Sequence, residues 1–248
     1  MRDLSSSLTG LPPSPLTAVI CRPRTPPRRG RPWALPLERR VVIGCTSLRT
    51  NLTVRELAAV FVISPAQAHR IVTDIVQRIA ALAGSTPVRL DRRHGWAVDG
   101  TLVPTRDHRI AAKAKNYRWS CNAQILIRRT DFRVIAIAGG GPGNRNHPIH
   151  YRGTHIEHLC QWHGRVLADG GYRGVRELVT PVFRGRRILR NHAWRRHRRR
   201  RARAEHAIAR RKDWRVLRDH RRRDRRLIES LRAVALLFNL NIELRYKS

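Results

Sequence analysis

The chain has 248 residues and a formal net charge of +35, from 52 lysines and arginines against 17 aspartates and glutamates. Apolar residues make up 41% of it, which is enough for a buried core and excludes wholesale disorder. No apolar run approaches the roughly 18 residues of a membrane-spanning helix. The positive charge indicates a polyanionic partner, and nucleic acid is the first candidate. The 4 cysteines form no CxxC pair, which suits a reducing compartment. We therefore expect a cytoplasmic protein without membrane association.

The N-terminal segment differs in composition from the rest of the chain. It holds seven prolines and a basic patch at Arg28, Arg29 and Arg31. Because such a segment cannot bury a core, residues 1–35 are expected to form a flexible arm.

Residues 36–90 predict a small all-helical domain. Thr53-x-x-Glu56 and Ser64-x-x-Gln67 are capping boxes that each begin a helix. Two capped helices about three residues apart indicate a helix-turn-helix. An ordinary helical hairpin is the alternative, because the turn holds Val62 where a glycine is usual.

The second of these helices would be the recognition helix of a DNA-binding domain. Gln67, His69 and Arg70 lie near its start, where side chains of a helix-turn-helix contact base edges and phosphates.

From residue 91 the apolar period changes from that of helices to that of strands. GWAVDGTLVP, CNAQILIRR and FRVIAIAGG predict three strands in succession, and the segments RVLAD and TPVF predict two more. A helix is expected at residues 154–163. Strands in series followed by strands that alternate with helices indicate an α/β domain with a mixed sheet over residues 91–248.

The end of the chain predicts two long helices of different character. Residues 184–226 contain 21 lysines and arginines against 4 acidic residues, and 192–217 could form one helix. The later segment RLIESLRAVALLFNL has apolar residues at helical spacing and is expected to pack on the sheet.

Three acidic residues stand out in this basic chain. Asp99 and Asp169 end apolar runs that predict buried strands, and Glu205 lies in the arginine-rich helix. A lone buried carboxylate is costly in free energy, whereas clustered carboxylates can hold divalent cations. In-line cleavage of a phosphodiester uses two such cations about 4 Å apart. The alternative is structural, with Glu205 paired to Arg201 one helical turn away.

Three short motifs contain these acids: Asp99-Gly100-Thr101, then ADGGYRG at 168–174, then Arg201-x-x-x-Glu205 followed by Lys212. They resemble the motifs of the DDE transposases of bacterial insertion sequences, in the branch related to Harbinger-type nucleases. The pair of capped helices resembles the same group. The likeness spans roughly residues 30–245.

The resemblance implies a ribonuclease-H-like catalytic domain behind a helix-turn-helix. Asp99, Asp169 and Glu205 would be catalytic ligands of Mg²⁺ or Mn²⁺, as two divalent ions. The implied activity is cleavage at the terminal inverted repeats of an element and strand transfer into target DNA. Arg201 and Lys212 would contact DNA phosphate, with a surface ion pair as the alternative. A homodimer or larger assembly on bacterial nucleoid DNA is expected.

The chain departs from the family pattern at three positions. Relatives usually carry an aspartate where this chain has His147, Arg211 replaces an expected apolar residue, and Val62 is in the turn. These departures motivate the alternative of an inactive or repurposed sequence-specific DNA-binding protein. A basic RNA-associated protein is a third interpretation, which explains the charge but not the acids.

Overall fold

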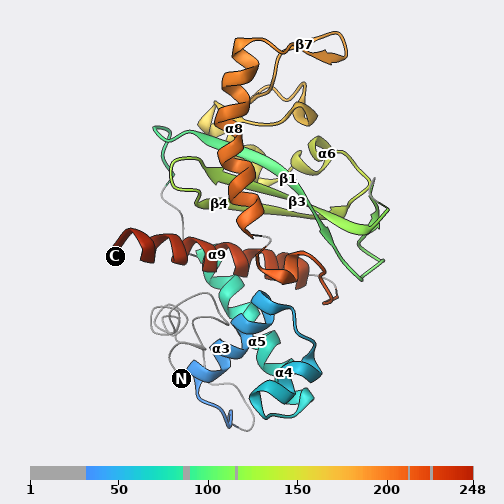
Figure 1. Cartoon of the computed structure of the whole chain (residues 1–248), viewed down its shortest axis with the longest axis vertical. Coiled ribbons are helices and arrows are strands. Elements are labelled where there is room, and N and C mark those ends of the chain that lie inside the picture. The colour runs from blue at the N-terminus through green and yellow to red at the C-terminus, as the bar shows by residue number, and fades with distance from the viewer. Residues whose placement is uncertain (1–31, 86–89, 115–116, 212, 224–225, 248) are drawn as a thin grey trace. The chain divides into compact units, whose positions relative to one another are not determined.

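The computed structural model describes residues 32–85, 90–114, 117–211, 213–223 and 226–247 (Figure 1). Most of the expected arm, residues 1–31, lies outside these ranges. Contacts divide the rest into two compact units. The first comprises the described residues of Met1–Thr86 with Trp214–Val216 and Glu229–Ser248, and the second comprises Pro87–Asp213 and Leu217–Ile228.

The first unit contains helices α3 (Leu37–Thr50), α4 (Val54–Phe61) and α5 (Pro65–Ser85). Their apolar faces form a core in which α3 and α4 both pack on α5. On α5 the side chains of Ile71, Ile75 and Ile79 are fully buried at four-residue spacing, as expected for an amphipathic helix. Ile43 and Leu48 of α3 and Leu57 of α4 are no more than 1% exposed.

The beginnings of α4 and α5 follow the sequence prediction. Thr53 accepts a hydrogen bond from the Glu56 amide while the Glu56 carboxylate accepts one from the Thr53 amide, so the capping box is complete. Ser64 Oγ accepts from the Gln67 amide at 3.2 Å. Three residues separate the helices, and Val62 ends α4 in the left-handed region at φ 54°.

The C-terminal helix α9 (Arg226–Lys247) does not group with the sheet as the sequence led us to expect. From Glu229 onward its contacts place it in the first unit. Its apolar side is buried, with Leu231, Val234 and Leu237 no more than 1% exposed. The apolar pattern predicted this buried face correctly.

The second unit is built on a mixed α/β sheet. Strands β1 (Trp96–Pro104), β3 (Trp119–Arg128) and β4 (Val134–Pro142) run antiparallel to their neighbours, in the order β4, β3, β1. These are the three strands expected in series. The two-residue strand β2 (Ala112–Lys113), which the sequence did not predict, also pairs with β3.

The other edge of the sheet is parallel. Strand β5 (Val166–Leu167) runs parallel to β1, and β6 (Leu178–Val179) runs parallel to β5. The strand expected at TPVF, residues 180–183, overlaps a strand of the structure only at Phe183. Instead β7 (Phe183–Arg184) forms a separate hairpin with β8 (Arg187–Ile188).

Helices α6 (His147–Tyr151) and α7 (His155–His163) contribute to the apolar core on one face of this sheet. Trp96, Val98 and Leu126 belong to that core, together with Tyr151 of α6 and Ile156 of α7. Because side chains alternate along a strand, Asp99 projects from the opposite face of β1.

Helix α8 (His192–Arg211) lies across β1 (Figure 1). It is shorter than the expected helix over 192–217, because a 3₁₀ turn, η2 (Arg215–Leu217), takes the end of that segment. Another 3₁₀ turn, η1 (Gly170–Tyr172), directly follows Asp169.

Candidate active site

Asp99 and Asp169 lie at the same level of two adjacent parallel strands. The register pairs Trp96 with Val166 and Ala97 with Leu167, so the two aspartates stand two positions beyond the last pair. Asp169 also caps η1, with its Oδ1 accepting from the Gly171 amide at 2.8 Å. The fold therefore brings together two acids that are 70 positions apart in the sequence.

Helix α8 presents three polar side chains at four-residue spacing on one face: His197, Arg201 and Glu205. His197 Nε2 donates to the Ala168 carbonyl oxygen at 3.0 Å, next to Asp169. Arg201 Nη2 lies 3.1 Å from Asp99 Oδ2 and 2.9 Å from Glu205 Oε1. These contacts fix α8 against the middle of β1 and the end of β5.

The charges of the three carboxylates act on one another. The pKa of Asp99 is raised to about 6, chiefly by burial; the Arg201 charge lowers it, and the charges of Asp169 and Glu205 contribute to raising it. The side chain of Asp99 is 13% exposed and that of Glu205 is 55% exposed. The cluster thus has a buried end at the sheet and an open end on α8.

In this cluster Arg201 supplies the positive charge. Its guanidinium bridges Asp99 and Glu205, and its buried Nε has no hydrogen-bond partner. Among the described residues, no group of three or more His, Cys, Asp or Glu side chains is arranged as a set of metal ligands. The donor chemistry suits a hard cation, but Arg201 takes the central position.

A chain of polar side chains lies beside the acids, and the sequence gave no sign of it. The Tyr172 hydroxyl donates to Gln124 Oε1, and Gln124 Nε2 donates to Asn122 Oδ1 at 2.9 Å. Asn122 in turn bonds His147 Nδ1 at 3.0 Å. The His147 ring stacks on Tyr172 with centroids 6.0 Å apart, so the last residue of this hydrogen-bonded chain contacts the first.

His147 also explains why residue 100 is a glycine. A Cβ added to Gly100 would lie 1.9 Å from His147 Nδ1. Burial lowers the pKa of His147, and the Asp169 charge raises it in opposition. The histidine therefore occupies the space next to the Asp99-Gly100 motif.

The candidate DNA-binding side chains of α5 lie at its exposed start. His69 and Arg70 are exposed and Gln67 is half-buried, while Ala68 and Ile71 face the core. A hollow of about 690 Å³ separates the beginning of α5 from α4, and its lining includes Arg55, Val62, Ser64 and Gln67. Lys212, the remaining candidate, lies outside the described residues, as does the side chain of Arg211.

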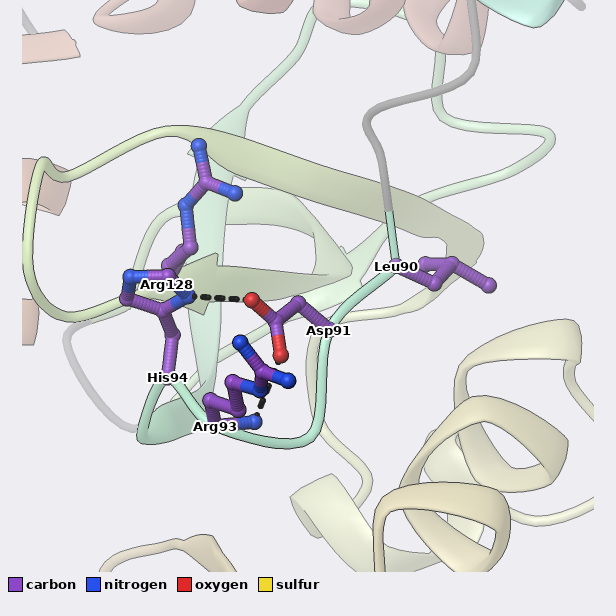
Figure 2. A pocket seen from close by; sticks show the side chains of 5 residues that line it. All are labelled: Leu90, Asp91, Arg93, His94 and Arg128. Atoms are coloured by element: carbon purple, nitrogen blue, oxygen red, sulfur yellow. Dashed lines mark hydrogen bonds and ion pairs between the residues drawn. The ribbon is translucent and has the colours of Figure 1, made fainter.

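A second hollow, of about 460 Å³, lies before β1 and holds none of the three acids (Figure 2). Asp91 accepts from the Arg93 amide at 2.7 Å and from His94 Nδ1 at 2.9 Å. Arg128, also on its wall, pairs with Asp131 at 2.6 Å. Because Asp91, His94 and Arg128 each have a hydrogen-bond or ion-pair partner, the candidate site remains the cluster of Asp99, Asp169 and Glu205 beside α8.

An arginine-rich helix over an acidic cluster, on a mixed sheet, is an arrangement suited to a protein that works on a polyanion. The chain is 38% identical over 221 residues to a protein of Streptomyces albus G named "Putative transposase for insertion sequence element IS112". The match covers 86% of this chain and 83% of that protein. The chain therefore belongs to the family of insertion-sequence transposases.

Two further findings complete the comparison. No protein-family model matches the chain. In the described part of the chain, none of the helices has the length and apolar character needed to cross a bilayer.

Proposed function

We propose that this protein is a DDE transposase that cuts and joins DNA with divalent metal ions at Asp99, Asp169 and Glu205. The observation that carries the proposal is the meeting of these three acids, from β1, the end of β5 and α8, in one electrostatically coupled cluster. Family membership supports the same conclusion.

The architecture is consistent with a ribonuclease-H-like domain of the Harbinger-related branch. Antiparallel β4, β3 and β1 continue into parallel β5 and β6. Ligands of open α/β sheets gather at the carboxyl ends of parallel strands, and Asp169 directly follows such an end.

The three carboxylates would hold two Mg²⁺ or Mn²⁺ ions, which supply an activated water or hydroxyl and relieve charge on the leaving oxygen. Arg201, released from the acids, would contact a DNA phosphate beside the site. Its planar guanidinium suits a phosphate as well as a carboxylate, and its Nε has no partner in the structure. Lys212 would make a similar contact.

The first unit would recognise the terminal inverted repeats as a helix-turn-helix. The supporting observations are the short connection between α4 and α5 and the exposure of His69 and Arg70. Gln67 lines the hollow beside them. Because two element ends must be brought together, we propose a homodimer or larger assembly on DNA.

One observation favours a second candidate, a DNA-binding protein without catalysis. Arg201 occupies the space between Asp99 and Glu205, and His147 stands where the resemblance to DDE transposases implies an acid. A copy that retained this arrangement with DNA bound would recognise the repeats but would not cut them.

The deciding experiment compares the wild type with Asp169→Asn on DNA that carries the element's terminal repeats, with Mg²⁺ or Mn²⁺. The wild type should nick at the repeats, and Asp169→Asn should bind equally and not cut. Binding without cleavage by both proteins, under either metal, would favour the second candidate. Equal cleavage by both would refute the assignment of Asp169.

A further inference from the structure

Exposed aromatic side chains gather at the end of the sheet where β1 ends and β3 begins. Tyr117 is 86% exposed and Trp119 is 37% exposed. His108 stacks on the Trp119 ring with centroids 4.3 Å apart and an angle of 13° between the planes. Trp119 thus keeps over a third of its surface open although one ring face is covered.

The backbone at Tyr117 is unfavourable for a tyrosine. Its φ of 60° lies in the left-handed region, in a turn where its amide donates to the Ala114 carbonyl at 2.8 Å. A bulky side chain there is strained, and glycine is the usual residue. The exposed ring makes no contribution to a core, so it is available for a contact with another molecule.

The surroundings of these rings are strongly basic. The Arg106 amide donates to the His220 carbonyl at 3.0 Å, so the arginine-rich segment after η2 lies beside the end of β1. Asp107 and Asp219 pair with nearby arginines. The exposed cations in these segments outnumber the two acids: Arg106, Arg109, Lys113, Arg118, Arg221 and Arg223.

We propose that Tyr117, Trp119 and His108 form a stacking surface for an unpaired DNA base. Aromatic rings set among arginines are how proteins hold single-stranded nucleic acid, because every base has a face that stacks and every nucleotide a phosphate. The surface adds a DNA contact separate from the start of α5. It rests on the proposed binding of DNA and not on catalysis by the acids.

The register of β1 gives the position of such a base. Asp99 and Thr105 are six residues apart along an extended strand, which corresponds to about 20 Å. At about 3.4 Å per nucleotide along one strand, the stacked base lies roughly six nucleotides from the phosphate at the acids.

The test measures binding of the full chain to two DNAs of the same sequence, a perfect duplex and one with a short unpaired bubble that contains 2-aminopurine. The metal is omitted, so cleavage plays no part. The wild type should bind the bubble more tightly and quench 2-aminopurine. Trp119→Leu and Tyr117→Gly should each lose roughly 5- to 160-fold in affinity for the bubble, the range of one stacked base, with duplex affinity unchanged.

Tyr117→Gly separates a contact from a structural role, since glycine relieves the positive φ and should leave thermal stability equal or higher. Trp162→Ala is the matched control, because Trp162 is 41% exposed and also lies beside an arginine. It should bind both DNAs as the wild type does.

Equal loss by Trp162→Ala, or no loss in any variant, would overturn the stacking surface while duplex binding still supported the proposed function. Tighter binding of single-stranded RNA than of bubble DNA would overturn the assignment to DNA. A wild type that binds neither DNA would overturn both.

Discussion

Arg201 Nη2 lies 3.1 Å from Asp99 Oδ2, and both side chains are largely buried, at 16% and 13% exposed. The same Nη2 contacts the more exposed Glu205 at 2.9 Å. The guanidinium therefore neutralises the buried end of the acid cluster before any cation or phosphate arrives.

The first prediction concerns the loss of this neutralising charge. Arg201→Ala leaves the Asp99 carboxylate buried without its cation and should destabilise the protein by about 1–3 kcal/mol at pH 7.5. Adding Asp99→Asn should restore most of that loss, because a neutral amide needs no counter-charge. Urea unfolding of both variants checks this, with Arg200→Ala, an exposed neighbour on α8, as the control. A double variant as unstable as Arg201→Ala would refute the coupling.

The second prediction concerns pH. Because the folded pKa of Asp99 is raised to about 6 from 3.8, the folded state favours the protonated acid, and stability falls as pH rises from about 4 to about 6. Asp99→Asn avoids this loss. It should be more stable than wild type by on the order of 3 kcal/mol at pH 7.5, with the difference vanishing near pH 4.

Asp131 provides a control of opposite sign for that experiment. Burial raises the pKa of Asp131, but the hydrogen bond and charge of Arg128 outweigh burial, so the net pKa lies below its usual value. Asp131→Asn should therefore be less stable than wild type at pH 7.5, with the difference shrinking as pH falls. Parallel curves for the two variants would show that the Asp99 effect is not specific.

A third prediction concerns the start of α5. Arg70→Ala should weaken binding to DNA at low salt and reduce the slope of log affinity against log salt by about 1, as expected when one phosphate contact is lost. Gln77→Ala, exposed two turns further along the same helix, should change neither quantity. Titrations at several salt concentrations distinguish the two, and an unchanged slope in Arg70→Ala would exclude a phosphate contact.

The fourth prediction concerns Val62, whose φ of 54° is unusual for a β-branched residue. Val62→Gly should raise stability by roughly 0.5–1 kcal/mol, because glycine adopts this backbone freely. Val60→Gly, inside α4, should lower it by about 1 kcal/mol. Thermal unfolding measures both, and a destabilised Val62→Gly would mean that the 87% exposed side chain has a partner in the folded protein.

The sequence predicted those parts of the site that are marked by a short sequence pattern, such as an apolar run or a helix-capping motif. Asp99 and Asp169 follow apolar runs, and the capping motifs begin α4 and α5 where expected. The bond from His197 to Ala168 joins residues 29 positions apart. The bond from Tyr172 to Gln124 spans 48 positions. No periodicity marks such pairs, although the spacing of four between His197 and Arg201 could have suggested a shared face.

The lack of a local sequence signal also explains which parts of the fold were predicted incorrectly. Strands β6, β7 and β8 have two residues each, which is too short for an alternating pattern. For α9 the sequence predicted an apolar face, but such a pattern does not identify the partner that covers it.

The grouping of Trp214–Val216 and Glu229–Ser248 with the first unit means that this unit is discontinuous in the sequence. A fragment that stops at residue 85 would lack Trp214, over which Arg49 stacks, and the buried side of α9. A premature stop near residue 229 would accordingly damage the half of the molecule that carries Arg70, although every acid of the cluster would still be translated.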